Sequence, residues 1–178
     1  YKQIDMNLLI VSVVRSGSSR LLESISTFYK QEGIFEPTTP QYKKDFNPKK
    51  DIVKIAIQTK SVDAHIELIN QFDNVILLDR KDILAQAESY LNLWEVLGGN
   101  YNSKYVSVKF SQEKIDKTID KFKKWKSDLK EISEKINQPI IYLEDLLEFK
   151  DIGDIGYDKA FFKPEHKLRQ SKKRKTRI

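Results

Sequence analysis

The chain has 178 residues, with two histidines and no cysteine, and a formal net charge of +6 at neutral pH. The absence of cysteine excludes a disulfide framework and a thiolate metal site, and two histidines argue against a histidine-rich zinc site. No apolar run approaches the roughly 20 residues that a membrane span needs, and the first residues lack the apolar core of a signal peptide. We therefore expect a cytoplasmic protein without a membrane span.

The positive charge is concentrated at one end of the chain. Residues 163–178 contain eight lysines and arginines and one acidic residue, whereas the rest of the chain contains 24 basic and 25 acidic residues. The positive net charge therefore comes from the tail and not from a basic domain, which weakens the interpretation that the protein binds nucleic acid. The length suits one folded unit, so we predict a single domain, residues 1–178, with a basic C-terminal segment at 163–178.

Apolar runs of strand length alternate with amphipathic segments. In chain order, they predict a strand at Asn7–Val14, a helix at Ser18–Gln31, a proline-containing loop at Gly33–Lys50, a strand at Ile52–Gln58, a helix at Val62–Gln71, a strand at Asn74–Asp79 and a helix from about Lys81 to Leu97, ended by Gly98 and Gly99. The helical spacing is clearest over Gln112–Ile136, and a short strand PIIYL and a helical turn EDLLEF follow. This alternation is typical of an α/β protein with a three-layer, mainly parallel sheet flanked by helices.

The stretch NLLIVSVVRSGSSRLL, near the start of the chain, joins the first predicted strand to the first predicted helix. Such a junction presents unpaired N–H groups and the positive end of the helix dipole at one point, which favours an anion. Gly17 allows close approach of the backbone, Ser16, Ser18 and Ser19 offer hydroxyl donors, and Arg15 offers a bidentate cation. The stretch predicts a phosphate or sulfate site, although such serines can also serve only as a helix cap.

The common phosphate-binding loops do not match this junction. The nucleotide triphosphate loop, G-x-x-x-x-G-K-[ST], has two glycines and a lysine, whereas the junction has one glycine and carries Ser18 where the lysine should stand. The dinucleotide fingerprint needs three glycines, and the junction has one. A different anion carrier is therefore expected.

A second informative stretch, NVILLDRKDILAQAESYLNLWE, places Arg80 just beyond a strand and Ser89 on the following helix. In a parallel sheet the ends of both strands open on the carboxyl edge, where ligands of such folds bind. We therefore expect Arg80 and Ser89 to contribute to the same ligand site. The alternative is that Arg80 pairs with Asp79 or Asp82 and that Ser89 is an ordinary helix residue.

Together the two stretches resemble the sulfotransferases, which transfer sulfate from 3′-phosphoadenosine 5′-phosphosulfate (PAPS). The family motif R-S-G-[ST]-[ST] matches Arg15–Ser19 and implies that these residues cradle the 5′-phosphosulfate on a P-loop-like sulfotransferase fold. The family's strand-end arginine and helix serine, which hold the 3′-phosphate, match Arg80 and Ser89. The pattern R-[RK]-D-x-x-x-Q-A-x-S most resembles bacterial carbohydrate sulfotransferases of the trehalose and Nod-factor group.

Two further matches lie later in the chain. LEDL at Leu143–Leu146 resembles the family's Y-E-D-L, with leucine in place of tyrosine. LRQS at Leu168–Ser171 resembles the L-x-R-Q segment that closes over the nucleotide in that group, which implies a role for Arg169 in holding the 3′-phosphate. The ordered matches extend over residues 8–171.

The resemblance implies sulfuryl transfer to a hydroxyl of a carbohydrate or another small polar acceptor, with no metal. Arg15 would stabilise the charge that grows on the leaving phosphate oxygen. Cytosolic relatives use a histidine as the general base, which is missing here, whereas the trehalose group implies a glutamate after the first helix, for which Glu36 is the nearest candidate. An exposed loop glutamate is the ordinary interpretation of Glu36, and Lys60 and His65 are weaker candidates.

Two other classes of function stay open. The basic tail can bind nucleic acid or a membrane surface through its charge, but it lacks interleaved aromatic residues, so specific recognition is not indicated. A small-molecule kinase on a similar sheet would need a triphosphate-loop lysine and a magnesium carboxylate at a strand end. Asp79 can supply the carboxylate, but nothing supplies the lysine.

Overall fold

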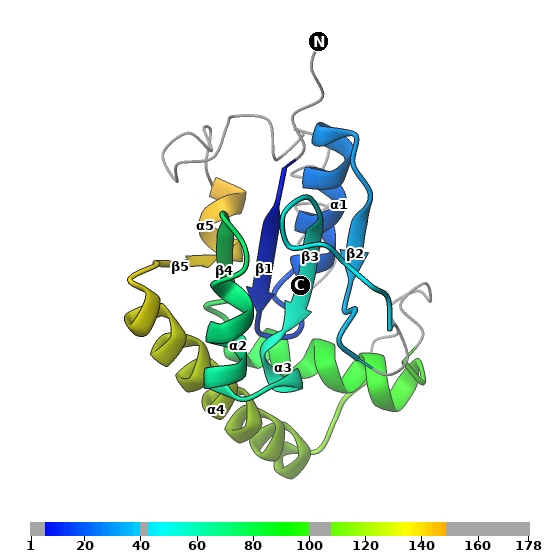
Figure 1. The fold of residues 1–178 in the computed structure, drawn as a ribbon. Coiled ribbons are helices and arrows are strands. Elements are labelled where there is room, and N and C mark those ends of the chain that lie inside the picture. Colours follow the sequence, from blue (N-terminus) through cyan, green and yellow to red (C-terminus); the bar gives the residue numbers. More distant parts are fainter. Residues whose placement is uncertain (1–5, 40–42, 100–107, 149–178) are drawn as a thin grey trace.

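The computed structural model of the protein describes residues 6–39, 43–99 and 108–148. These residues form a parallel sheet of five strands in the order β2-β3-β1-β4-β5 (Figure 1). The strands are β1 (Leu8–Ser12), β2 (Gly33–Phe35), β3 (Ile52–Ala56), β4 (Val75–Asp79) and β5 (Ile140–Tyr142). Helices cover both faces of the sheet, so the predicted three-layer α/β fold is confirmed.

The helices follow the predicted order. They are α1 (Ser18–Tyr29), α2 (Val62–Ile69), α3 (Ile83–Leu91), α4 (Gln112–Ile136) and α5 (Leu143–Glu148), with a short 3-10 turn, η2 (Ile57–Thr59), and a π-helical segment, η3 (Asn92–Val96). Gly98 and Gly99 adopt positive φ angles of 56° and 81° directly after η3, as expected for residues that end a helix. No helix in the described ranges has the length and apolar character needed to cross a membrane.

Strand β2 was not expected, because the sequence predicted a continuous loop at Gly33–Lys50. The strand is only three residues long and pairs in parallel with β3, from Gly33 opposite Ile52 to Phe35 opposite Lys54. So short a segment carries no periodic signal of its own, and its pairing with a neighbouring strand stabilises it. The loop prediction was therefore wrong at its first residues.

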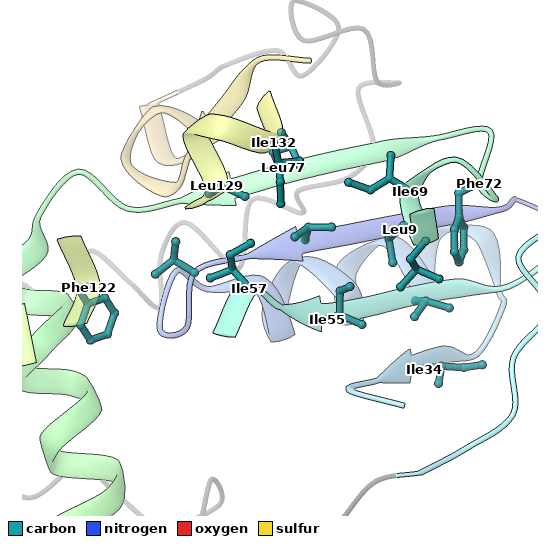
Figure 2. Packing of buried hydrophobic residues seen from close by; sticks show 14 of the residues in the cluster. Leu9, Ile34, Ile55, Ile57, Ile69, Phe72, Leu77, Phe122, Leu129 and Ile132 are labelled. Atoms are coloured by element: carbon teal, nitrogen blue, oxygen red, sulfur yellow. The ribbon is translucent and has the colours of Figure 1, made fainter. Parts of the chain in front are cut away.

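The core consists of two apolar layers, one on each face of the sheet. In one layer, side chains of β1, β3 and β4 pack against α2 and α4, and Figure 2 shows Leu9, Ile55 and Leu77 of the sheet together with Leu129 and Ile132 of α4. In the other layer, alternate residues of the same strands pack against α1 and α5. Strands β1 and β3 are buried on both faces, which explains their nearly continuous apolar sequence.

The connections diverge at the carboxyl ends of β1 and β4, which are neighbours in the sheet. The chain leaves β1 for α1 on one face, and it leaves β4 for α3, whose Ala87 packs into the layer on the opposite face. In open parallel sheets, ligands bind at such a divergence, in the crevice outside the carboxyl ends of the strands. The first two sequence motifs follow these two strands.

Candidate functional site

The turn between β1 and α1 contains two left-handed residues and leads directly into the N-terminus of α1. Arg15 and Gly17 adopt left-handed conformations with φ angles of 63° and 85°, and Gly17 is the N-cap of α1. The Gly17 carbonyl accepts hydrogen bonds from the N–H groups of Arg20 and Leu21, both at 3.1 Å. No side chain of the described residues makes a cap hydrogen bond at this end of the helix, so the interpretation of the serines as a helix cap is wrong.

The serines of the turn differ in exposure. Ser16 is fully buried, and its Oγ has no hydrogen-bond partner within the described residues. Ser18 is also buried, whereas Ser19 is exposed to solvent. A buried hydroxyl without a partner costs free energy, so Ser16 offers a donor that a bound oxyanion would satisfy.

Helix α3 is tied directly to this turn. The Nε of Arg15 donates a hydrogen bond to Ser89 Oγ at 2.9 Å, across 74 residues of sequence. One turn earlier in α3, the amide of the buried Gln86 donates to the carbonyl of Val14 at 2.8 Å. The structure therefore brings together Arg15 and Ser89, which the resemblance assigned to the 5′-phosphosulfate and to the 3′-phosphate of one nucleotide.

Arg80 lies at the end of β4 and pairs with a residue of the third motif. Its Nε is 3.4 Å from Glu144 Oε1, although this nitrogen makes no hydrogen bond of good geometry within the described residues. Glu144 also accepts from the backbone N–H of Lys81 at 2.9 Å and of Asp82 at 3.3 Å. The proposed pairing of Arg80 with Asp79 or Asp82 is therefore wrong. Asp82 instead caps α3.

The third motif also contacts the first. A Cβ atom placed on Gly17 would lie 2.9 Å from Cδ1 of Leu143, so the leucine side chain packs directly against the turn. This residue stands where the resembling family has a tyrosine. Through Leu143 and Glu144, the start of α5 thus touches both the turn after β1 and the segment after β4.

The ordinary interpretation of the sequence expected Glu36 to be an exposed loop residue, but the structure buries it. It directly follows β2, is 6% exposed and has a positive φ angle of 45°. Its carboxylate forms an ion pair with Lys54 and accepts a hydrogen bond from the N–H of Ala56 at 2.9 Å. Burial lowers the pKa of Lys54, Glu36 opposes this shift, and the charge of Arg15 adds to it. Glu36 and Lys54 therefore form a buried ion pair, and the positive charge of Arg15 disfavours the ammonium form of Lys54.

The two weaker base candidates are placed differently. Lys60 is exposed just after η2. His65 is fully buried in α2, and its Nδ1 lies 2.8 Å from the carbonyl oxygen of Ser61. Burial lowers the pKa of His65, and nearby Lys60 adds to this shift, while the Ser61 and Ala56 carbonyls and the charge of Asp128 oppose it. His65 is thus a packing residue.

The buried His65 leads to a prediction for stability against pH. Its pKa is lower in the folded than in the unfolded chain, so below pH 6.5 the unfolded state binds more protons. We expect the free energy of unfolding to fall between pH 6.5 and 5, by at most about 1.4 kcal/mol per pH unit. Denaturant titrations at several pH values should show that the free energy of unfolding depends less steeply on pH for His65→Gln than for the control His166→Gln, which replaces the other histidine of the chain. Equal slopes for the two variants would contradict this assignment.

Asp79, the possible magnesium ligand of a kinase, already has a cation. Lys126 of α4 places its Nζ 2.7 Å from each carboxylate oxygen and 2.5 Å from the carbonyl oxygen of Arg80. The described residues contain no group of three acidic, histidine or cysteine side chains that could hold a metal ion. Nothing described favours the kinase alternative.

Sequence reasoning missed several residues of the site. Gln86 appeared only within a motif, and Lys126 was not proposed for any role. Lys54 carried a signal that was overlooked, since it is a charged residue within the otherwise apolar strand IVKIA. Arg169 and the basic segment at 163–178 lie outside the described residues.

No protein-family model matches this chain, and the search of curated proteins likewise found no match. The resemblance to sulfotransferases therefore depends on short motifs alone.

Proposed function

We propose that the protein is a PAPS-dependent sulfotransferase that sulfates a hydroxyl of a carbohydrate or another small polar acceptor. The observation that carries this proposal is the hydrogen bond between Arg15 and Ser89, which joins the two segments expected to hold the nucleotide. It lies at the carboxyl edge of a parallel sheet, beside a helix N-terminus at which none of the described side chains makes a cap hydrogen bond. This arrangement favours a ligand with more than one anionic group.

The two arginines of the site suit a nucleotide that carries phosphate at two positions. Arg15 and the start of α1 form one group of donors, and Arg80 at the end of β4 forms a second. In the structure the positive charge of Arg80 faces Glu144. A 3′-phosphate would replace this carboxylate contact by a charge-assisted hydrogen bond.

The proposed reaction relies on positioning and on charge stabilisation. The acceptor oxygen forms a bond to sulfur while the bond from sulfur to the 5′-phosphate oxygen breaks, and 3′-phosphoadenosine 5′-phosphate leaves. Arg15 and the amides of the turn stabilise the charge that develops on that phosphate oxygen. The hydroxyl proton passes to Glu36, whose carboxylate is paired with Lys54.

Arg80→Ala is expected to weaken binding of 3′-phosphoadenosine 5′-phosphate. Loss of a charge-assisted phosphate contact costs roughly 1.5 to 3 kcal/mol, which is about tenfold or more in affinity. Lys130→Ala removes the same charge from an exposed position of α4 and serves as the control. Equilibrium titration of both variants measures the difference, and equal affinities would refute the assignment of Arg80 to the 3′-phosphate.

The function itself is tested by turnover. The full chain is incubated with PAPS and a panel of sugars and small alcohols, and sulfated products are detected by mass spectrometry together with released 3′-phosphoadenosine 5′-phosphate. A sulfated acceptor that is absent with Arg15→Ala would support the proposal. Binding of the nucleotide without transfer to any acceptor would instead indicate a nucleotide-binding protein.

A further inference from the structure

We propose that Lys54 is a positioning residue that holds the carboxylate of Glu36 in place to receive the proton of the acceptor hydroxyl. This inference rests on the proposed function. It concerns a buried lysine that neither the motifs nor the proposed donor contacts use. Lys54 acts through Glu36 and does not itself contact the transferred group.

Lys54 is held by its surroundings on two sides. Its side chain is 5% exposed, and that of Glu36 is 8% exposed, so their ion pair is almost entirely removed from water. The Lys54 ammonium also lies 4.4 Å from the centre of the Phe35 ring, in the geometry of a cation–π contact. A buried charge persists only when it is paired, so the Lys54 ammonium has one stable position, and that position is against Glu36.

Glu36 is fixed by its backbone as well as by its side chain. Its N–H donates to the carbonyl of Lys54 at 2.8 Å, and its own carbonyl accepts from the N–H and the Oγ1 of Thr39 at 3.0 and 2.9 Å. The left-handed backbone of this residue is a costly conformation that its surroundings must enforce. A carboxylate held in this way has a defined orientation, which a general base requires.

The carboxylate lies at the edge of the sheet that carries the donor motifs. Its Oε2 accepts from the N–H of Ala56, the last residue of β3, and Ala56 is in register with Ser12 at the end of β1. Arg15 follows Ser12 by three residues, and the charge of Arg15 adds to the burial that lowers the pKa of Lys54. The ion pair and the turn after β1 therefore share the carboxyl edge.

The contacts of Glu36 with Lys54 and Ala56 do not use all the hydrogen-bond acceptor sites of its carboxylate. An ionised carboxylate has about four lone-pair sites, and Lys54 and Ala56 use one on each oxygen. The remaining sites can accept the proton of a hydroxyl. Without Lys54, the carboxylate would keep, of its contacts with the described residues, the hydrogen bond from the Ala56 N–H, and it would lose its fixed orientation.

The test compares the full chain with Glu36→Gln, Lys54→Met and the double variant. Each protein is given PAPS with water as the acceptor, so that no knowledge of the natural acceptor is needed. Water attacks sulfur, the bond to the 5′-phosphate oxygen breaks, and the products are sulfate, 3′-phosphoadenosine 5′-phosphate and a proton that Glu36 passes to solvent. The turnover number, the affinity for 3′-phosphoadenosine 5′-phosphate and the thermal unfolding of each protein are measured.

We expect Lys54→Met to lower the turnover number by about 10²-fold, as for a misplaced catalytic group, with nucleotide affinity changed less than about twofold. In the Glu36→Gln background, the same substitution should change neither quantity. Lys54→Arg, which keeps the cation, should retain part of the activity. If Lys54→Met does not fold, two other comparisons decide the question. The double variant should still fold, since replacing both partners removes the unpaired buried charge, and it is compared with Glu36→Gln. The activity of Lys54→Arg is compared with that of the unaltered chain.

Three results would overturn the proposal. An unchanged turnover number for folded Lys54→Met would mean that the ion pair only stabilises the fold. An equal loss of turnover with and without Glu36 would mean that Lys54 acts directly on the sulfuryl group. Failure of the unaltered chain to bind 3′-phosphoadenosine 5′-phosphate would refute the proposed function and this inference with it, and the titration identifies that case separately.

Discussion

Arg15→Ala is expected to lower the rate of sulfuryl transfer by about 10² to 10³-fold, the effect of removing one donor that stabilises charge in a transition state. Nucleotide affinity should fall by only about tenfold, because the amides of the turn and Arg80 still hold the two phosphate positions. The difference arises because the charge on the leaving phosphate oxygen grows during the reaction. The variant also loses the hydrogen bond to Ser89.

Single-turnover measurements at saturating PAPS separate these two effects for Arg15→Ala. Ser89→Ala removes the hydrogen-bond partner of Arg15 but leaves the Arg15 charge in place. Because Ser89 is assigned to the 3′-phosphate, this variant should weaken nucleotide binding but retain most of the rate at saturating PAPS. A fall in affinity with the rate unchanged would show that Arg15 only binds the ground state. Its proposed role in the transition state would then be wrong.

Asp79→Ala is expected to lower the free energy of unfolding by about 3 kcal/mol, because it leaves the ammonium of Lys126 without its carboxylate. Asp79 is nearly buried, with 5% of its side chain exposed, whereas Lys126 keeps 21% and can regain some solvent. The value is therefore at the lower end of the range for broken buried ion pairs. Nucleotide binding should weaken too, since Lys126 also holds the carbonyl of Arg80.

Chemical denaturation of Asp79→Ala, compared with the double variant Asp79→Leu/Lys126→Met, tests this prediction. The double variant removes both charges and should recover most of the lost stability. A loss below about 1 kcal/mol in the single variant would show that Lys126 is solvated well enough to need no partner. The ion pair would then contribute little to the geometry of the site.

Much of the fold could be predicted because its signals are local. The apolar stripe of α4 lies within one continuous segment, and the structure places this helix at the predicted residues, Gln112–Ile136. The buried strands β1, β3 and β4 carry apolar runs that no amphipathic helix would show. Strand β2 could not be predicted, because three residues have no period and depend on pairing with β3.

The sequence predicted which segments follow the strands at the carboxyl edge, but it did not predict the contacts between them. A strand-to-helix turn with glycine and arginine has a recognisable sequence, and parallel topology places Arg80 near it. The partner of Arg80 was not predictable, because Glu144 lies more than 60 residues away and reaches it only through the pairing of β4 with β5. Likewise, the burial of Glu36 depends on β2 and on the distant Lys54.

The most direct test of the donor site is calorimetric titration of the full chain with 3′-phosphoadenosine 5′-phosphate, beside ATP and a short single-stranded oligonucleotide. We expect micromolar binding of the bisphosphate and much weaker binding of ATP, which lacks the 3′-phosphate that Arg80 would hold. No binding of the bisphosphate, together with salt-sensitive binding of the oligonucleotide, would contradict the assignment and point to the basic tail as the functional part.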